Sequence, residues 1–400
     1  MKNEFIPYAR QSISRADCNQ MNRSLTSEFI TRGPCVEKFE GEVARYCGSK
    51  FAVAFNSGST ALIAAFHAAK VNQFDRLIST PNTFIATIGS GIQCGASVTL
   101  VDIDPITANI DIEQVEQALS KRYSRGRPIV VPVHFAGVAV DIEAMDNLLK
   151  VPDALIIEDG CHALGSRYPN GRRVGCCDFS QMTVFSFHPA KTITTGEGGM
   201  VTTNDEELFH NLKLFRNNGI ERSPPYLQEE PKPWYYEVHE LTSNYNFTEF
   251  QAALGLSQLA RIEEFIEKRR RLVAVYRKLL NGVPNISFLP EEYDSSTAFH
   301  LFVAKIDFEA YKTSRESVME ALYDEGIGTQ VHYIPLYRHP CMIKILGDIS
   351  SQFPEMERYY ATALSLPLYF DLTFEDVERV VASLLKILNS GKSNNRSSRK

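Results

Sequence analysis

The stretch Phe185-Ser186-Phe187-His188-Pro189-Ala190-Lys191-Thr192-Ile193-Thr194-Thr195-Gly196-Glu197-Gly198-Gly199 decides how the rest of the chain is interpreted. The apolar run from Met182 to Phe187 predicts a buried strand, and Lys191 follows shortly after its end. Open α/β sheets place their ligands at the ends of strands. A lysine at such a place is either a solvated surface residue or an amine nucleophile that binds a carbonyl group, such as that of pyridoxal 5′-phosphate (PLP).

The residues around Lys191 help to decide between a surface lysine and an amine nucleophile. Ser186 can donate its hydroxyl to a phosphate, and Gly198 and Gly199 suit a tight turn into a strand at 200–203. The run Ser-Phe-His-Pro-x-Lys, with Thr-Thr-Gly-Glu-Gly-Gly behind it, resembles the cofactor-lysine segment of the DegT/DnrJ/EryC1/StrS family of PLP-dependent sugar aminotransferases. The resemblance implies that Lys191 carries the cofactor covalently and that Ser186 contacts its phosphate.

The composition is that of an ordinary globular protein. The chain has 400 residues, of which 44% are hydrophobic and 22% charged, and its length favours two domains. A formal net charge of −6 argues against a nucleic-acid-binding protein. The sequence shows neither the apolar segment of a signal peptide nor a long apolar run, so we expect a cytoplasmic protein without a membrane span.

The eight cysteines form no pattern typical of a metal site. They are scattered, and no C-x-x-C pair occurs among them. We therefore expect no metal and interpret the cysteines as free thiols in a reducing compartment.

A short polar loop follows the strand predicted at 51–55. Asn56-Ser57-Gly58-Ser59-Thr60 leads into a helix at 61–69, an order that offers backbone N–H groups and a positive helix end to an anion. The same residues also suit an ordinary helix cap. In the resembling family this loop binds the cofactor phosphate, which implies the backbone of Gly58 and Ser59 here.

Two further segments match the family in the same order. Pro81-Asn82-Thr83-Phe84-Ile85-Ala86-Thr87 is similar to Pro-x-Thr-Phe-x-Ala-Thr, which implies that Phe84 stacks on the cofactor ring instead of being a plain core residue. Glu158-Asp159-Gly160-Cys161-His162-Ala163-Leu164-Gly165 is similar to Glu-Asp-x-x-(Gln/His)-Ala-x-Gly. The resemblance places Asp159 at the ring nitrogen, which its charge keeps protonated, and His162 near the ring hydroxyl. A helix cap is the alternative role for the carboxylate.

The segment from Thr242 to Gly255 resembles Gly-x-Asn-x-Arg-x-x-Glu-x-Gln-x-Ala-x-Gly. Asn244 and Glu249 match, whereas Thr242 and Asn246 replace the family's first glycine and its arginine. The resemblance implies that Asn244 reaches the cofactor phosphate of a neighbouring subunit, and hence a homodimer with shared active sites. The resemblance assigns no role to Asn246.

Two weaker matches concern the substrate. Thr31-x-Gly-Pro-x-Val-x-x-Phe-Glu resembles the start of the family's domain, where the loop approaches the active site. Gln330-Val331-His332-Tyr333-x-Pro335 resembles its His-Tyr-x-Pro segment. They imply substrate contacts by Thr31 and His332, with a purely structural histidine as the alternative.

The remaining pattern predicts alternating strands and helices, followed by a smaller domain. We expect a long helix over 248–281, broken near Ala260, with Lys268 to Arg271 on a solvated face. Residues 1–25 show no strong pattern, and 219–236 reads as a long surface loop. Further strands are expected at 98–101, 129–133, 154–157, 300–306 and 329–332, and further helices at 36–46, 205–217, 314–324 and 374–388.

The resemblance extends from about Ile6 to Leu388 and implies a fold type I aminotransferase. Its large α/β/α domain, with a mixed, mainly parallel sheet, would span residues 1–255. A small α+β domain would span 256–390, before a disordered polar tail at 391–400.

The implied reaction moves the amino group of glutamate, which leaves as 2-oxoglutarate, to a ketone on a nucleotide-linked 4-keto-6-deoxysugar. Lys191 would carry the proton during this transfer. The motifs around Lys191 and His332 resemble most the pseudaminic-acid branch, which acts at C4 of a UDP-linked sugar. The sequence alone identifies neither the nucleotide nor the configuration of the sugar.

Two rival functions remain at this point. A PLP-dependent sugar dehydratase of the same family would carry histidine at the position of Lys191. A non-enzymatic regulatory protein could keep the fold, but the chain retains both Lys191 and Asp159 and shows no appended DNA-binding segment. The sequence therefore favours the aminotransferase.

Overall fold

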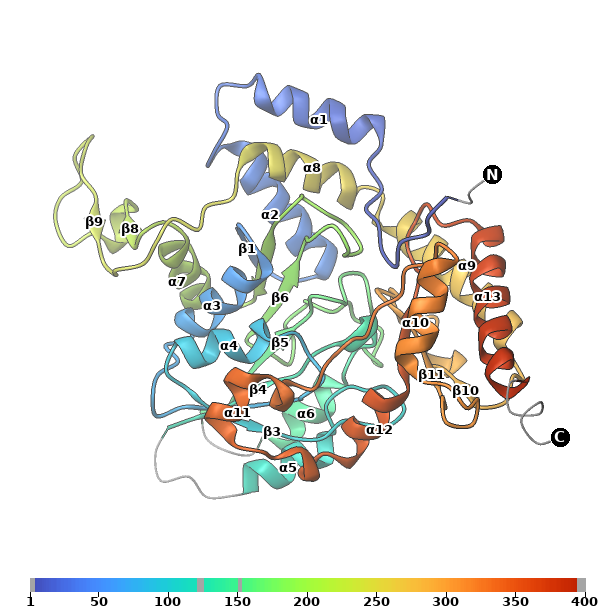
Figure 1. Ribbon diagram of the computed structural model, residues 1–400. Helices are drawn as coiled ribbons and strands as arrows, with labels where there is room; N and C mark the ends of the chain where they lie inside the picture. Colours follow the sequence, from blue (N-terminus) through green and yellow to red (C-terminus); the bar gives the residue numbers. More distant parts are fainter. Residues whose placement is uncertain (1–3, 121–125, 150–152, 394–400) are drawn as a thin grey trace.

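The computed structural model describes residues 4–120, 126–149 and 153–393. Its centre is a seven-stranded sheet with the order β1-β7-β6-β5-β4-β2-β3 (Figure 1). Strands β2 to β6 are parallel, and β7 runs antiparallel to both of its neighbours, β1 and β6. The expected mixed, mainly parallel sheet is confirmed. The strands are β1 Phe51–Phe55, β2 Arg76–Ser79, β3 Ser97–Leu100, β4 Pro128–Val131, β5 Leu155–Asp159, β6 Met182–Ser186 and β7 Gly199–Thr203.

Helices cover both faces of this sheet because its strand residues are apolar on both sides. Val53 and Phe55 pack against one layer of helices, and the alternate residues Ala52 and Ala54 pack against the other. The first layer contains α3 Gly58–Ala68 and α7 Glu206–Arg216, with α4 Ala86–Gln93 beside α3. The second contains α2 Pro34–Cys47, α5 Ile112–Ser120, α6 Ile142–Leu148 and α8 Glu249–Leu259. The result is a three-layer α/β/α domain.

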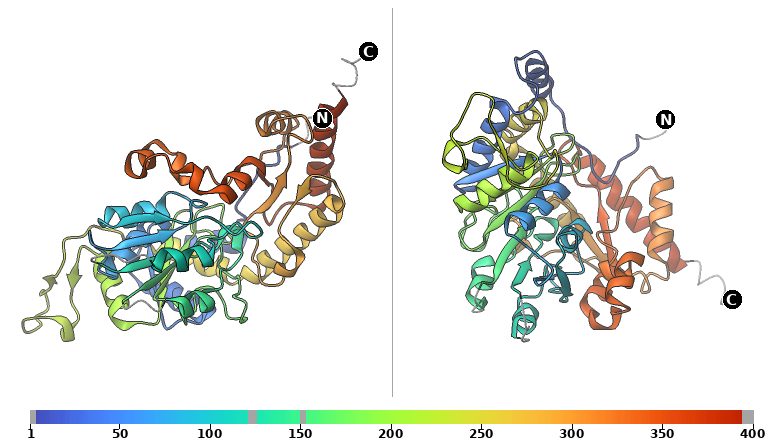
Figure 2. Two further views of the ribbon diagram at one scale, coloured as in Figure 1. Left: turned by 90° about the horizontal axis from the view of Figure 1, so that it is seen from below. Right: turned by 90° about the vertical axis from the view of Figure 1, so that its left-hand side faces the viewer.

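A smaller antiparallel sheet, β10-β11-β12, forms a second core beside the large domain (Figure 2). Its strands are β10 Ile286–Ser287, β11 Phe302–Ile306 and β12 Ala363–Leu366, and its helices are α9 Ile262–Leu280, α10 Arg315–Asp324 and α13 Phe374–Ser393. Ile6 of the N-terminal segment joins this second core and pairs with Ile327. A domain boundary at residue 255 stays a prediction, and 394–400 lie outside the described residues.

Two further helices return from the small domain to the large one. These are α11 Pro340–Leu346 and α12 Pro354–Thr362. The carboxylate of Asp102 accepts the backbone N–H groups of Glu355 and Met356 at the start of α12, at 2.8 and 2.9 Å. This cap joins the start of α12 to the large domain just after β3.

Several sequence predictions are wrong in instructive ways. The helix α1, Arg15–Leu25, was not predicted, although Ser14 and Asp17 form a capping box at its start and it lies along α8 (Figure 1). The strand expected at 329–332 is absent: only Gln330 pairs, with Ser365, and β12 takes the third place in the small sheet.

The solvated face predicted for the basic cluster on α9 is wrong for Arg269. This guanidinium is 3% exposed and donates to the carbonyl oxygens of Phe299, His300 and Leu368. The run of four basic residues gave no sign that Arg269 would be buried. The helix directs this one residue into the interior where α9 passes between the domains. The predicted break near Ala260, in contrast, is confirmed by the end of α8 and the start of α9.

An arm formed by residues 219–243 projects from the large domain (Figure 2). The surface loop predicted at 219–236 begins with β8 Ile220–Glu221, which pairs with β9 Glu237–Val238 just after the loop to form a two-stranded ribbon. Trp234 and Leu241 on this arm are 73% and 98% exposed. Large apolar side chains gathered on a projecting arm are typical of a surface that another chain covers.

All eight cysteines are free thiols. Within the part of the chain that the structure describes, no helix is both long enough and apolar enough to span a bilayer.

Candidate active site

A cavity of about 420 Å³ lies where β5 and β6 end and α3 begins. It brings together residues from eight separate stretches of the chain, and small-domain residues close one side of it. Of the residues predicted from the sequence, Gly58, Ser59, Phe84, Asp159, His162, Ser186, Lys191 and His332 line it. Thr31 and Asn244 are not among its lining residues.

The start of α3 forms the end of the cavity that suits a phosphate. Ser57 caps the helix by accepting the N–H of Thr60 at 3.1 Å, so α3 begins at Gly58, three residues earlier than predicted. The first N–H groups of a helix have no partner within it, and its positive end attracts anions. The N–H groups of Gly58 and Ser59 are therefore available to a ligand in the cavity.

Two glycines let the backbone approach closely at this point. A Cβ at Gly58 would lie 2.9 Å from Cβ of Ser186, and one at Gly199 would lie 2.3 Å from the carbonyl oxygen of Ser57. Gly199 begins β7 and is needed for this approach, whereas Gly196 adopts the left-handed backbone of the preceding turn, with φ of 80°. The tight turn expected at Gly198 and Gly199 therefore begins earlier than predicted.

We expect Gly58→Ala to weaken cofactor binding by about tenfold or more, since the added methyl group must displace Ser186 or the start of α3. The control is Gly41→Ala in α2, where an added Cβ meets no atom within 4 Å. That variant should bind the cofactor as the wild type does and unfold at a slightly higher temperature. Fluorescence titration of the apoproteins with PLP gives the dissociation constants. Equal constants for all three proteins would refute the phosphate site at Gly58.

Asp159 lies at the end of β5 with its carboxylate held in place. Oδ2 accepts the hydroxyl of Thr87 at 2.6 Å, and Oδ1 accepts the N–H of Cys161 at 3.1 Å. Thr87 in turn contacts Thr83 at 2.7 Å. Two donors on an ionised carboxylate fix its direction, which a partner for a ring N–H⁺ requires. Thr87 was not singled out in the sequence, although it ends the segment that supplied Phe84.

Lys191 lies on the same side of the cavity. Its backbone N–H is bound to the carbonyl of His188 at 2.8 Å, which closes a turn just after β6. Burial lowers the pKa of the ammonium, while nearby Cys161 and Asp159 act in the opposite direction. A lowered pKa increases the fraction of the free amine, the form that can attack a carbonyl or accept a proton.

Phe84 offers an aromatic face to the cavity. It is 58% exposed and lines the cavity. A flat ring bound in the cavity would cover it. The helix start, the two close-packed glycines, the fixed carboxylate and the lysine together fit the phosphate, ring nitrogen and aldehyde of PLP.

Three histidines form the opposite wall of the cavity. His162 accepts the N–H of Ala136 on Nδ1 at 3.3 Å, and its Nε2 lies 3.0 Å from the hydroxyl of Tyr333. The rings of His162 and His300 are 4.3 Å apart. Burial lowers the pKa of both imidazoles well below the usual value. They are therefore neutral at physiological pH.

His332 stands beside them on the small-domain side. Its Nδ1 lies 2.9 Å from the hydroxyl of Ser365, and its ring packs on Tyr8 with centroids 5.8 Å apart. Burial, aided by Lys191, lowers its pKa to about 4. Tyr333 was within the His-Tyr-x-Pro match and could have been singled out. Tyr8 and His300 carry no sequence signal, because only tertiary packing brings them here.

The segment that carries Asn244 forms a separate polar cluster. Oδ1 of Asn244 accepts the backbone N–H and the side-chain amide of Asn246, at 3.1 and 2.8 Å. Asn246 also donates to Asn217, which accepts a further bond from Arg32. Asn246, which replaces the family's arginine, thus helps to stabilise this turn. Arg32, from another loop, lies close to it.

Glu249, for which the sequence suggested no role, caps a helix far away in the chain. Its carboxylate accepts the N–H groups of Gly33, Cys35 and Val36 at 2.9 to 3.0 Å. Thr31 pairs with Thr248 next to it. The loop at 31–33 is therefore fixed against the start of α8, close to the cluster around Asn244.

Comparison with known proteins agrees with this geometry. The model of the DegT/DnrJ/EryC1/StrS aminotransferase family matches residues 11–385. The UDP-4-amino-4,6-dideoxy-N-acetyl-β-L-altrosamine transaminase of Campylobacter jejuni is 33% identical over 97% of this chain and 99% of its own.

Solved structures of sugar aminotransferases show the same fold. Helicobacter pylori PseC, an aminotransferase involved in the biosynthesis of pseudoaminic acid, has a TM-score of 0.87 at 28% identity, over 97% of this chain and 100% of its own. The PLP form of the putative sugar aminotransferase Spr1654 from Streptococcus pneumoniae has a TM-score of 0.86 at 25% identity, over 97% of this chain and 99% of its own.

Proposed function

Because this chain belongs to the DegT/DnrJ/EryC1/StrS aminotransferase family, we propose that it transfers the amino group of glutamate to C4 of a UDP-linked 4-keto-6-deoxysugar. The enzyme is a PLP-dependent nucleotide-sugar aminotransferase. One observation carries the proposal: a single cavity holds a lysine, a fixed carboxylate and a helix start. The full-length similarity to a UDP-sugar transaminase supports the choice of nucleotide and carbon.

Each residue that lines the cavity would have a separate role. When bound, PLP would supply the carbonyl group through which an amino group is exchanged between the two substrates. Lys191 would hold the cofactor through Nζ and, as a free amine, would move the proton from the donor's Cα. Asp159 keeps the ring nitrogen protonated through a charge-assisted hydrogen bond. Gly58, Ser59 and Ser186 bind the phosphate, and Phe84 covers one face of the ring.

A panel of nucleotide sugars tests the substrate. The purified enzyme, with glutamate, is offered 4-keto-6-deoxysugars linked to UDP, dTDP and GDP, and the corresponding 3-keto isomers. We expect the highest kcat/KM with the UDP-linked 4-keto sugar, measured from 2-oxoglutarate release and from the mass of the product. A preference for another nucleotide or for C3 would overturn this assignment, although the family would stand.

We also propose a homodimer with shared active sites. Asn244 is not part of its own subunit's cavity, and the arm at 219–243 exposes Trp234 and Leu241. Asn244 would then complete the phosphate site of the other subunit across a two-fold interface. The eight free thiols and the glutamate donor support a cytoplasmic location.

Complementation between two inactive variants tests the shared site. Lys191→Ala removes the cofactor lysine, and Asn244→Asp adds a charge that repels the phosphate. In a mixed dimer, the site built on the second subunit keeps Lys191 and takes Asn244 from the first. Random pairing makes about half of the dimers mixed, each with one intact site, so about a quarter of wild-type activity should return.

The control is each variant unfolded and refolded alone. If Asn244 served its own subunit, no pairing would restore a complete site. Activity no greater than the sum of the separate variants, with subunit exchange verified by mass, would rule out the shared site.

A further inference from the structure

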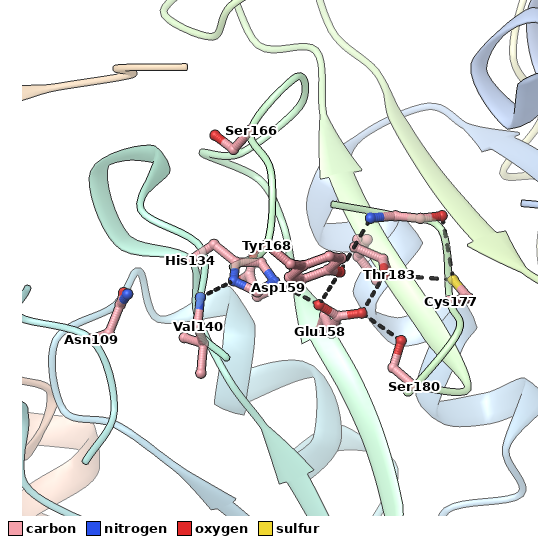
Figure 3. Close-up of polar contacts among 12 residues, drawn as sticks. Asn109, His134, Val140, Glu158, Asp159, Ser166, Tyr168, Cys177, Ser180 and Thr183 are labelled. Atoms are coloured by element: carbon pink, nitrogen blue, oxygen red, sulfur yellow. Dashed lines mark hydrogen bonds and ion pairs between the residues drawn. The ribbon is translucent and has the colours of Figure 1, made fainter. Parts of the chain in front are cut away.

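Strand β5 ends in two carboxylates that point to opposite faces of the sheet. Asp159 lines the cavity, whereas Glu158 is fully buried. Figure 3 shows the polar contacts around Glu158. Four side chains contact Glu158: the hydroxyls of Ser180 and Thr183 (2.7 Å) at Oε1, and the hydroxyl of Tyr168 (2.6 Å) and Nε2 of His134 (2.7 Å) at Oε2. This is a complete set of donors for one ionised carboxylate.

None of these four donors carries a positive charge. Nδ1 of His134 accepts the backbone N–H of Val140 at 3.0 Å, so it holds no proton. The single proton of this imidazole is then on Nε2, which donates it to Glu158. The other three donors are neutral hydroxyls. The negative charge of Glu158 is thus hydrogen-bonded but not neutralised.

The carboxylate stays ionised in spite of its burial. Burial alone would raise the pKa of Glu158, but the hydrogen bond and electrostatic attraction of His134, together with the hydrogen bonds from Ser180 and Tyr168, hold it below the usual value. The nearby titratable groups on this face are Cys176, Cys177 and Tyr168, and burial raises the pKa of each of them. Among the described residues, neither lysine nor arginine forms an ion pair with Glu158.

The network is also joined to Asp159 through the backbone. The N–H of His134 donates to the carbonyl of Asp159 at 3.1 Å, and the N–H of Asp159 donates to Pro132 at 2.9 Å. Glu158 therefore fixes the residues after β4 through its hydrogen bond to His134. These residues lie next to Asp159, where the side chain of Asp159 enters the cavity. On the cavity side, Asp159 stands with Lys191, Cys161 and the neutral histidines described above.

We propose that Glu158 is a positioning residue that supplies a second fixed negative charge behind Asp159, so that the two together hold the proton on the cofactor's ring nitrogen. Glu158 is fully buried, so dissolved ions screen its charge less than that of an exposed carboxylate. Glu158 touches neither cofactor nor substrate and works through Asp159. The inference depends on the PLP cofactor and not on which sugar is the substrate.

The test is the pH titration of the cofactor's ring nitrogen in Glu158→Gln, followed by the ¹⁵N chemical shift of bound PLP that is labelled at this nitrogen. A glutamine can keep the network, because the hydroxyls of Ser180 and Thr183 can turn to accept from its amide group. Removal of a negative charge disfavours nearby protonated groups, so the midpoint should move to lower pH, by about one unit for one charge in a protein interior. No sugar substrate is needed, so a wrong substrate assignment would not affect the result.

Thr183→Val is the matched control. It removes one hydrogen bond to Glu158 but keeps the charge, so the unfolding temperature should fall while the midpoint stays in place. If Glu158→Gln does not fold, Glu158→Ala tests the same loss of charge, since water can fill a polar cavity among the four donors. A folded, cofactor-loaded Glu158 variant with the wild-type midpoint would overturn the proposal. An equal shift in Thr183→Val would do so as well, because it would show that packing and not charge sets the midpoint.

Discussion

Replacement of Lys191 by alanine should abolish transamination and leave the fold intact. The rate should fall by roughly 10³-fold or more, because the variant loses both the cofactor attachment and the amine that moves the proton. The unfolding temperature of the apoprotein should not decrease. Lys191 lies in a turn after β6, and burial already disfavours its ammonium form. Steady-state kinetics and thermal unfolding of the same preparations measure both quantities.

Lys344→Ala, at an exposed position on α11, is the control and should keep wild-type activity. Borohydride reduction of the wild-type holoenzyme, followed by peptide mapping, should place the cofactor on the peptide that contains Lys191. A cofactor adduct on another lysine would refute the role given to this residue.

Asp159→Asn should retain the cofactor and lose most of the rate. Asparagine has nearly the same shape but lacks the charge that stabilises a protonated ring nitrogen. A hydrogen bond to a charged group contributes about 1.5–3 kcal/mol, which corresponds to a loss of about ten- to a hundredfold in kcat. Single-turnover kinetics with glutamate, followed by cofactor absorption, measure the loss directly.

Thr87→Val provides a graded comparison for Asp159. It removes the 2.6 Å hydrogen bond that orients the carboxylate but leaves the charge in place. Its rate should lie between those of the wild type and Asp159→Asn. Activity of Asp159→Asn within twofold of the wild type would contradict the role assigned to the carboxylate.

Eight of the ten residues predicted for the site line one cavity, because they lie in short, contiguous segments of the sequence. Gly58 and Lys191 follow the end of a strand, Asp159 is the last residue of one, and parallel strands bring their carboxyl ends to one edge of the sheet. The order of these short segments along the chain was therefore enough to predict which residues lie together in the cavity. The close approach of Gly58 to Ser186 is also a local property of glycine beside a neighbouring strand.

The structural features that could not be predicted from the sequence depend on contacts between distant segments. Arg269 is buried by carbonyl groups contributed by two other stretches of the small domain, which periodicity along α9 cannot reveal. Glu249 caps α2 from more than two hundred residues away. Glu158 looked like a companion of Asp159 in one motif, yet its partners come from four other places in the chain.

Transfer of labelled nitrogen tests the central claim most directly. The enzyme is incubated with [¹⁵N]glutamate and a UDP-linked 4-keto-6-deoxysugar, and the sugar nucleotide is analysed by mass spectrometry and NMR. We expect an amino sugar that carries ¹⁵N at C4, in an amount equal to the 2-oxoglutarate released. A sugar that has lost a hydroxyl without gaining nitrogen, or an amino sugar without the label, would contradict an aminotransferase that uses glutamate.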